Sequence, residues 1–193
     1  MAAEATTPML TPAIREKILA YIPRYPSKRA VTLPALHIVH EYLRCVPYQA
    51  MVEIAELLEI TAAEVHDTMS FYGFFPQAPI GDVRVWICRS LSCMITGGDE
   101  MLEYACKKLG VRSGQTTPDG KLTVEFAECL GICDYAPAAL ADDGRIFGPL
   151  TPEKVDAMLE ELKKGPVDPS HGLNPSSGAA KPSTSEVLNS KPN

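Results

Sequence analysis

Four of the six cysteines in the chain form two close pairs. Four residues separate Cys88 from Cys93, and three residues separate Cys129 from Cys133. The 35 residues from 94 to 128 lie between the pairs, which is enough for a helix and a strand that bring the two loops together. Four thiolates from two loops can ligate a [2Fe–2S] cluster, in which each tetrahedral iron takes two bridging sulfides and two cysteines. The spacing therefore favours single-electron transfer at one such cluster.

The same thiols leave two other kinds of site open. A structural zinc site also takes four thiolates, but usually with two residues inside each pair, so gaps of four and three fit zinc less well. A dithiol redox site needs Cys-x-x-Cys, which the chain lacks. A Rieske centre needs two histidines, and no histidine stands beside a cysteine pair. Cys45 and Cys106 lie on apolar helical stretches and are interpreted as small core residues.

No motif for an organic cofactor accompanies the cysteines. The sequence has no Gly-x-Gly-x-x-Gly after a predicted strand and no Walker-type loop. No Ser/His/Asp set or pair of carboxylates stands out either. We therefore expect no complete active site in this chain, which must act beside a protein that handles the substrate.

Composition limits where the protein works and what it binds. The formal net charge of −6 argues against nucleic-acid binding, which normally rests on a basic face. No apolar run approaches the roughly 20 residues that cross a bilayer. The first residues contain neither a basic leader nor an apolar stretch, so no secretory signal is expected. A cytoplasmic location follows as the expectation, in which the thiols stay reduced and disulfides are disfavoured.

The first segment, residues 11–76, is predicted to be helical. Apolar residues at helical spacing and the capping signals Thr11-Pro12 and Thr61-Ala-Ala-Glu64 predict four helices, near residues 12–22, 34–45, 48–58 and 62–70. The aromatic residues that follow, Phe71, Tyr72, Phe74 and Phe75, are interpreted as a packing seam. Residues 52–70 also resemble a helix-turn-helix, but the segment from 49 to 75 has no Lys or Arg, so we interpret it as a packing module.

The second segment, residues 80–165, is predicted to have a thioredoxin-like α/β fold. Alternating apolar residues predict strands at 83–88, 121–127, 138–141 and 145–147. Helices are expected from Gly97 to about Leu109 and from Thr151 to before Gly165. The last helix should bury Val155, Met158, Leu159 and Leu162. Both cysteine pairs then follow strands and lie on loops.

The remainder, residues 166–193, is predicted to be a disordered tail. It has five prolines, six serines and no aromatic residue. Such a segment buries too little apolar surface to offset its ordering entropy.

The motifs taken together resemble those of a known family, the thioredoxin-like [2Fe–2S] subunit of NADH:quinone oxidoreductase, or complex I. The resemblance covers roughly residues 12–164. It rests on Tyr25-Pro26, Ala30-Val31, Leu33-Pro34, Ser70-Phe71-Tyr72, Cys88-x4-Cys93-x3-Gly97, Gly114-Gln-Thr-Thr-x-Asp-Gly120 and Glu128-Cys129-Leu-Gly-x-Cys133-x3-Pro137.

The resemblance implies a specific assembly. The four paired cysteines would ligate one [2Fe–2S] cluster, and Pro137 would shape the last loop near it, with a cis bond as a hypothesis. The partner would be the flavoprotein subunit that binds NADH and FMN, with the N-terminal helical segment helping to dock on it. The chain would then be an enzyme only as a subunit, beside other peripheral-arm subunits, and would reach the inner face of the cell membrane only through the complex.

Other assemblies and another class of function stay open. Similar subunits occur in NAD-linked hydrogenases and formate dehydrogenases, and a structural or assembly subunit could hold a metal site without essential electron flux. Two features depart from the family's pattern. His37 and His40 stand where a Gln is expected in the second helix, and Arg89 replaces a small residue or Thr after Cys88. Either departure could alter partner contacts or the cluster's potential.

Overall fold

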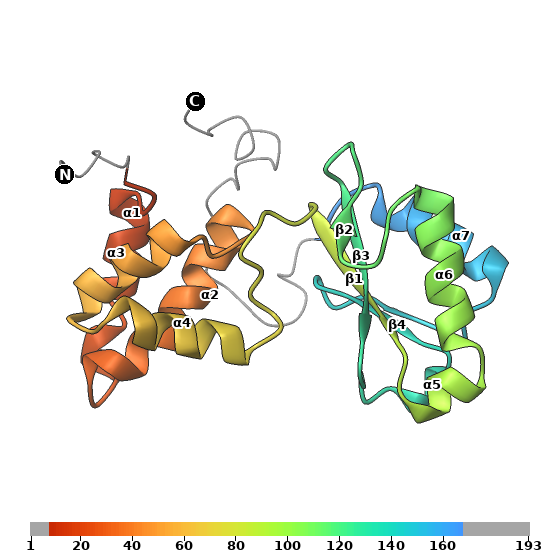
Figure 1. Ribbon diagram of the computed structural model, residues 1–193, viewed down its shortest axis with the longest axis horizontal. Helices are drawn as coiled ribbons and strands as arrows, with labels where there is room; N and C mark the ends of the chain where they lie inside the picture. Colours follow the sequence, from red (N-terminus) through yellow and green to blue (C-terminus); the bar gives the residue numbers. More distant parts are fainter. Residues whose placement is uncertain (1–7, 168–193) are drawn as a thin grey trace. The chain divides into compact units, whose positions relative to one another are not determined.

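The computed structural model describes residues 8–167 (Figure 1). The described residues fall into two compact units that divide after Pro79, and each unit has its own hydrophobic core. The predicted tail lies outside the described residues from position 168 onward. Within residues 8–167, no helix is both long enough and apolar enough to span a bilayer.

The first unit consists of helices. Its α-helices are α1 (Pro12–Leu19), α2 (Thr32–Leu43), α3 (Tyr48–Leu58) and α4 (Ala62–Phe71), and short 3-10 helices cover Ile22–Arg24 and Lys28–Val31. The predicted caps are present, because Thr11 accepts a hydrogen bond from the Ile14 amide and Thr61 forms a capping box with Glu64. Helix α2 begins at Thr32 rather than near Pro34, since the 3-10 turn that precedes it runs directly into the helix.

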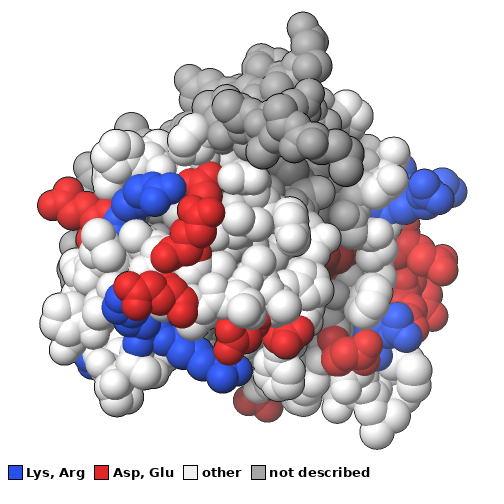
Figure 2. All heavy atoms as spheres, turned by 60° about the vertical axis from the view of Figure 1, so that its left-hand side comes forward, with Lys and Arg blue, Asp and Glu red and all other residues white. Residues whose placement is uncertain are grey.

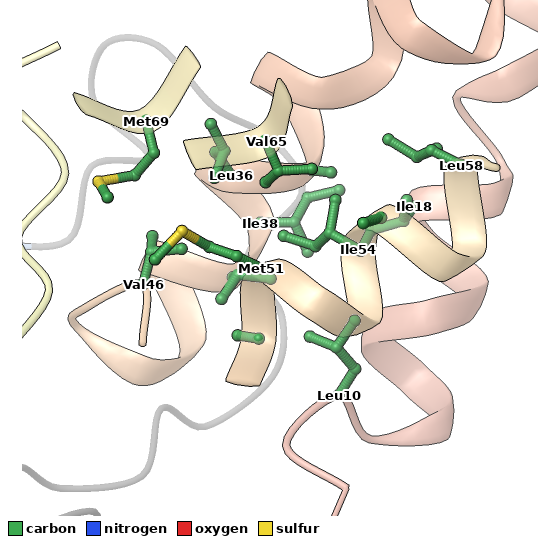
Figure 3. Packing of buried hydrophobic residues seen from close by; sticks show 14 of the residues in the cluster. Leu10, Ile18, Leu36, Ile38, Val46, Met51, Ile54, Leu58, Val65 and Met69 are labelled. Carbon is green, nitrogen blue, oxygen red and sulfur yellow. The ribbon is translucent and has the colours of Figure 1, made fainter. Parts of the chain in front are cut away.

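The core of this unit is built from the apolar faces of all four helices (Figure 3). Ile18 of α1, Leu36 of α2, Ile54 of α3 and Val65 of α4 are fully buried in it. The aromatic segment behaves differently from the packing seam that was predicted. Phe75 is buried and Phe74 is half-buried, but Phe71 at the end of α4 is 80% exposed. That part of the prediction is wrong, because α4 turns Phe71 away from the core.

Glu53 ties the start of the described chain to α3. Its carboxylate accepts hydrogen bonds from the amides of Met9 and Leu10, at 2.7 and 3.1 Å, and from the Arg15 guanidinium at 2.8 Å. Burial alone would raise the pKa of Glu53, but these hydrogen bonds outweigh it and leave the pKa lowered. The ionised carboxylate therefore stabilises the folded unit above the pKa of an unfolded Glu, and this contribution is lost as pH falls through the lowered folded pKa.

Glu53→Gln is expected to lower the free energy of unfolding by about 2 kcal/mol at neutral pH, since hydrogen bonds to a charged group contribute about 1.5–3 kcal/mol. The difference from the wild type should shrink in acid, where the wild-type carboxyl is also neutral. Urea unfolding followed by circular dichroism measures this, with Glu56→Gln, at an exposed position of the same helix, as the matched control. Equal losses in the two variants, or a loss that does not depend on pH, would contradict the assignment.

The second unit is a five-stranded sheet with helices. Its strands are β1 (Val83–Cys88), β2 (Gln115–Thr116), β3 (Leu122–Ala127), β4 (Ala139–Ala141) and β5 (Ile146–Phe147), in the order β2-β3-β1-β4-β5. Strand β1 is parallel to β3, and the other pairs are antiparallel. Helices α5 (Leu91–Ile95), α6 (Gly98–Leu109) and α7 (Pro152–Leu162) complete the unit, with a 3-10 turn at Cys133–Tyr135. The thioredoxin-like prediction is confirmed, although it missed β2 and α5.

Helices α6 and α7 lie side by side against the sheet (Figure 1). Strand β1 contributes Val83, Val85 and Ile87 to their shared core, and α7 buries the four residues that the sequence predicted, Val155, Met158, Leu159 and Leu162. Phe126 shares the alternation of Leu122 and Val124 along β3, but it is exposed. Along β3 the buried side chains therefore end at Val124, whereas on β1 Ile87, the partner of Phe126, is still in the core.

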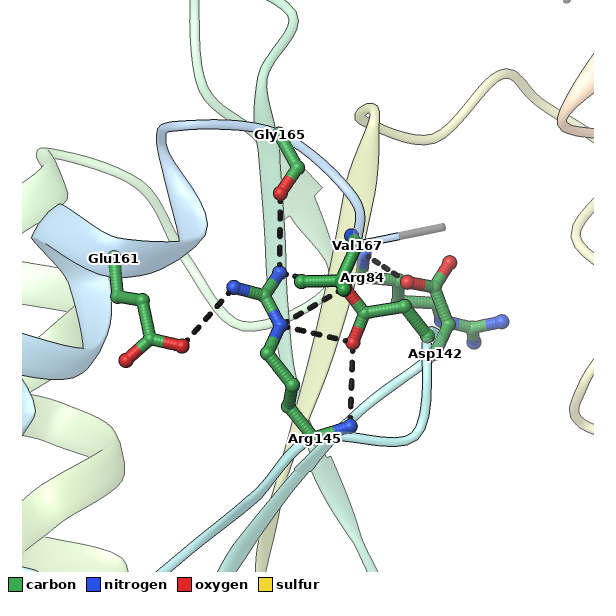
Figure 4. A network of polar contacts seen from close by, with 7 residues as sticks. Arg84, Asp142, Arg145, Glu161, Gly165 and Val167 are labelled. Atoms are coloured by element: carbon green, nitrogen blue, oxygen red, sulfur yellow. Dashed lines mark hydrogen bonds and ion pairs between the residues drawn. The ribbon is translucent and has the colours of Figure 1, made fainter. Parts of the chain in front are cut away.

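A polar network fastens the β4–β5 hairpin to the end of α7 (Figure 4). The Arg145 guanidinium donates to the Asp143 carboxylate at 2.6 Å, to Glu161 of α7 at 3.2 Å and to the Gly165 carbonyl at 3.2 Å. The Val167 amide donates to Asp143 at 3.1 Å. Burial opposes ionisation of Asp143, but the hydrogen bonds from Arg145 and Val167 leave its pKa lowered. The hairpin is therefore held in place at the edge of the sheet.

Charges on the face shown in Figure 2 are mixed rather than segregated. Lys and Arg side chains stand beside Asp and Glu there, and wide uncharged areas separate them. In the first unit, Lys28 pairs with Glu59 at 2.5 Å and Arg29 with Glu64 at 3.3 Å. Exposed pairs of this kind contribute little to stability.

Candidate metal centre

The fold brings the four paired cysteines to one edge of the sheet. Parallel pairing sets Cys88, the last residue of β1, opposite Ala127, the last residue of β3. Cys129 therefore follows two residues beyond the same edge, and Cys133 begins the 3-10 turn after it. Cys93 returns to this edge on α5, a short helix where the sequence suggested a loop. All four side chains line one pocket of about 60 Å³, together with Ser90, Leu91, Ser92, Gly131 and Ile132.

One cysteine pair is buried and the other is open to solvent. Cys88 is 4% exposed and Cys93 is 2% exposed, whereas Cys129 and Cys133 are exposed. Burial raises the pKa of the Cys93 thiol, and the neighbouring Cys88 and Cys133 thiols raise it further, against a hydrogen bond with the Ala138 backbone that lowers it. Without a bound metal these surroundings favour the neutral thiol of Cys93, and ligation of a metal displaces its proton.

The amino-terminal end of α6 approaches the buried pair closely at Gly98. A Cβ atom at this position would lie 2.6 Å from the Cys88 carbonyl oxygen and 2.9 Å from the Cys93 carbonyl oxygen. Only glycine lets the helix begin there. Gly97 just before it has a φ of +97°, a left-handed conformation that also favours glycine. The positive end of the helix dipole consequently faces the cysteine segment, where it favours thiolates and an anionic group.

The loop that carries Cys129 and Cys133 is closed by backbone hydrogen bonds. The Ala136 amide donates to the Cys133 carbonyl at 3.1 Å, and the Cys88 amide donates to the Ala138 carbonyl at 2.9 Å. The Ala136–Pro137 bond between these contacts is cis, as hypothesised from the resemblance. One residue of each pair, Cys88 and Cys133, is thus bonded to the same stretch of backbone, residues 136–138.

The remaining candidates lie elsewhere. Cys45 is buried, and burial raises its pKa to about 11. Cys106 is half-buried on α6, so both behave as the small packing residues that were predicted. His37 and His40 belong to the first unit, where their rings contact Phe75 and Phe74 at 4.9 and 4.7 Å between centroids. Their suggested effect on partner contacts stays a prediction.

Four soft sulfur donors suit an iron–sulfur cluster in these surroundings. Two donors are shielded from water, the other two are open, and a helix amino terminus favours negative charge between them. Within residues 8–167, no three His, Cys, Asp or Glu side chains are gathered closely enough to hold a single metal ion. All four cysteines line the same pocket.

Exposed apolar side chains beside the pocket escaped the sequence analysis. Leu91 and Ile95 of α5 are 68% and 73% exposed, and Met94 between them is also exposed. Tyr135 is exposed beyond Cys133. The signal is present in the sequence, since Leu91, Met94 and Ile95 recur at helical spacing around Cys93. This signal is missed when residues 91–95 are interpreted as a loop.

The chain has relatives among proteins of known complexes. Residues 18–163 match the family model described as thioredoxin-like [2Fe-2S] ferredoxin. A subunit of the NADH-quinone oxidoreductase of Rhizobium meliloti is 35% identical over 150 residues, which are 78% of this chain and 89% of that protein. NADH-quinone oxidoreductase subunit 2 of Thermus thermophilus is 33% identical over 144 residues, or 74% of this chain and 80% of that one.

A solved structure extends the comparison to a second kind of complex. A chain of an NAD+-reducing [NiFe]-hydrogenase in the H2-reduced state superposes with a TM-score of 0.59 at 28% identity. The match covers 69% of this chain but 22% of the hydrogenase chain, so the protein spans about a fifth of that relative. The family model includes both cysteine pairs and most of the first unit, which confirms the predicted resemblance. The chain belongs to the thioredoxin-like [2Fe–2S] ferredoxin family.

Proposed function

We propose that this chain is the electron-transfer subunit of an NADH:quinone oxidoreductase, with Cys88, Cys93, Cys129 and Cys133 as the ligands of one [2Fe–2S] cluster. The observation that carries the proposal is the convergence of these four thiols on one pocket at the edge of the sheet. Identity of 33–35% to subunits of that complex over most of the chain supports the choice of assembly.

The two cysteine pairs have different tasks in this proposal. Cys88 and Cys93 keep one side of the pocket dry, and the amino terminus of α6 supplies positive potential there. Cys129 and Cys133 form the open side, from which a partner's cofactor can approach. When bound, the cluster supplies one-electron redox chemistry. The chain itself needs no proton-transfer group, and the NADH and FMN sites belong to the flavoprotein subunit beside it.

Chemical analysis of the full chain, purified without oxygen, tests the proposal. About two irons and two acid-labile sulfides per chain are expected, with a rhombic spin-half EPR signal after reduction by dithionite. Zinc in place of iron, without sulfide and without a signal, would contradict the electron-transfer role and leave a structural subunit. Co-purification with a flavoprotein subunit then identifies the assembly.

The second candidate is the equivalent subunit of an NAD-linked hydrogenase. The superposition on the hydrogenase chain favours it, because the match covers 69% of this chain, which is more than either compact unit contains by itself. Both candidates use the same cluster and a flavoprotein partner. They differ in the other subunits, so recovery of a hydrogenase subunit rather than quinone-reductase subunits in the purified complex decides between them.

The exposed apolar face of α5 is the proposed contact for the flavoprotein. Leu91 lines the pocket itself, and Met94 and Ile95 continue the apolar surface away from it. Exposed apolar patches next to a functional site are typical of protein contacts. A partner seated here would cover the open side of the cysteine site.

Ile95→Asp should therefore weaken association with the co-expressed flavoprotein at least about tenfold, which is the effect expected for a charge placed in an interface hot spot. Affinity purification with measured subunit ratios gives the result. Ile146→Asp, an exposed isoleucine on β5 of the same unit, is the matched control and should retain binding. Iron content must stay unchanged in both variants. Normal association of the Ile95 variant would place the flavoprotein contact elsewhere.

A further inference from the structure

Arg89 is a positive charge between Cys88 and Ser90, two residues that line the cysteine pocket, although Arg89 itself does not line it. It follows Cys88 in sequence, and its amide donates to the Ala127 carbonyl at 3.0 Å, which prolongs the β1–β3 pairing past the end of the strands. Its guanidinium lies over the Phe126 ring, 4.7 Å from the ring centroid. A guanidinium on an aromatic face at this distance is held by a cation–π interaction.

The strand register explains this contact. Ile87 of β1 stands opposite Phe126 of β3, and Arg89 lies two residues beyond Ile87 on the same side of the extended chain. The two side chains are therefore diagonal neighbours, within reach of each other. Phe126 is exposed although its partner Ile87 is buried, and the Arg89 guanidinium lies over its ring. The ring therefore positions the arginine next to β1 and β3, the strands that lead to Cys88 and Cys129.

The charges of the two cysteine segments make Arg89 distinctive. In the sequence of residues 88–98 and 127–137 it is the only Lys or Arg, and the acidic residues there are Glu128 and Asp134. Within residues 8–167, no carboxylate forms an ion pair with Arg89. Among these residues its charge is therefore not held in a direct ion pair.

We propose that Arg89, positioned by Phe126, raises the reduction potential of the cluster that the four cysteines hold. A [2Fe–2S] cluster with four thiolates carries about two negative charges, and one added electron makes about three. A nearby fixed positive charge stabilises the more negative state more strongly, so it favours the electron on the cluster. The inference rests on the proposed function for its cluster, but it assigns Arg89 a role of its own, which is to tune the potential, and Phe126 the role of positioning Arg89.

The test compares full-length chains purified without oxygen and titrated redox-potentiometrically with EPR detection. Arg89→Gln is expected to weaken one-electron reduction about three- to tenfold, which is a fall of about 30–60 mV at 59 mV per tenfold change. Arg89→Lys should keep most of the wild-type potential. Lys121→Gln is the control, because it also removes one positive charge. Lys121 is exposed and directly precedes β3, at the end of the strand away from the cysteines, so the potential should stay within about 10 mV of the wild-type value.

Two further measurements separate charge from structure. The fall caused by Arg89→Gln should shrink between about 0.1 M and 1 M salt, because the Debye length drops from about 10 to 3 Å. Phe126→Leu should lower the potential in the wild type, but not in the Arg89→Gln background, because the ring acts only through the arginine.

The outcomes distinguish this inference from the proposed function. Absence of iron and sulfide in the wild type would contradict the proposed function itself. If the wild type holds its cluster, two results would overturn the role of Arg89 alone. One is an Arg89→Gln variant with the wild-type potential, and the other is a fall in potential that does not change with salt. If Arg89→Gln fails to bind a cluster, the Phe126→Leu variant decides. A fully loaded Phe126→Leu variant with the wild-type potential would also overturn the role of Arg89.

Discussion

Cys129→Ala and Cys133→Ala are each expected to lower iron and acid-labile sulfide below about a tenth of the wild-type content. Alanine offers no donor atom, and a cluster with three thiolates leaves one iron open to exchange and hydrolysis. Both cysteines are exposed, so the substitutions disturb no packing. A loss of iron and sulfide in these variants therefore reports lost ligation rather than a damaged core. Cys88→Ala and Cys93→Ala would not separate the two effects as cleanly, because those cysteines are buried.

The matched control for these variants is Cys106→Ala. Cys106 is half-buried on α6 and contacts the core of the same unit, so its replacement tests the general effect of removing a thiol. It should retain two irons and two sulfides. Metal analysis with visible absorption and EPR of the reduced protein gives the comparison. Full cluster content in either Cys129→Ala or Cys133→Ala would remove that residue from the ligand set and reopen the assignment.

Turnover of the assembled complex then asks whether the cluster carries essential electron flux. A complex that assembles with the Cys129 variant and still reduces quinone at the wild-type rate would make the cluster a side site. Failure of the complex to assemble would support a structural role of the cluster, because ligation and folding of the loop are coupled.

The meeting of the two cysteine pairs could be predicted, but their surroundings could not. Strands before Cys88 and Cys129 are evident from alternation, and parallel strands end at one edge of a sheet. Which pair is buried depends on how α6 packs at Gly98, a tertiary contact that leaves no periodic signal. Strand β2 has two residues, which is too short for periodicity to reveal. The five-residue helix α5 does show helical spacing in Leu91, Met94 and Ile95, but the stretch was interpreted as a loop.

Alternation also fails to tell where a core stops. Phe126 carries the same pattern as Val124, yet one is exposed and the other is buried. Phe71 is likewise a large apolar residue at the end of α4, yet it is exposed to solvent. Long amphipathic helices were predicted best, and α3 and α7 begin and end within a residue or two of the expected positions. Periodicity and burial agree in those helices, whereas the aromatic residues are placed by neighbours that only the fold supplies.

Gly98→Ala is expected to destabilise the second unit by about 3 kcal/mol and to lower cluster content with it. In most helices alanine is the better residue, by up to about 1 kcal/mol. Here the new Cβ would meet two backbone carbonyl oxygens, at 2.6 and 2.9 Å, and neither can rotate away as a side chain would. Steric overlap in packed surroundings costs about 1–3 kcal/mol or more, so it outweighs the gain in helix propensity.

Relief of this overlap would move α6 away from Cys88 and Cys93. Cluster content should therefore fall together with the stability of the unit. Urea unfolding followed by the fluorescence of Trp86, the only tryptophan in the chain and a residue of β1, measures the stability of this unit. Gly73→Ala is the control, because a Cβ at Gly73 has no atom within 4 Å, and circular dichroism should show a change within about 0.5 kcal/mol. If Gly98→Ala matched the wild type in both stability and iron content, the close approach of α6 would not be what holds the buried cysteines in place.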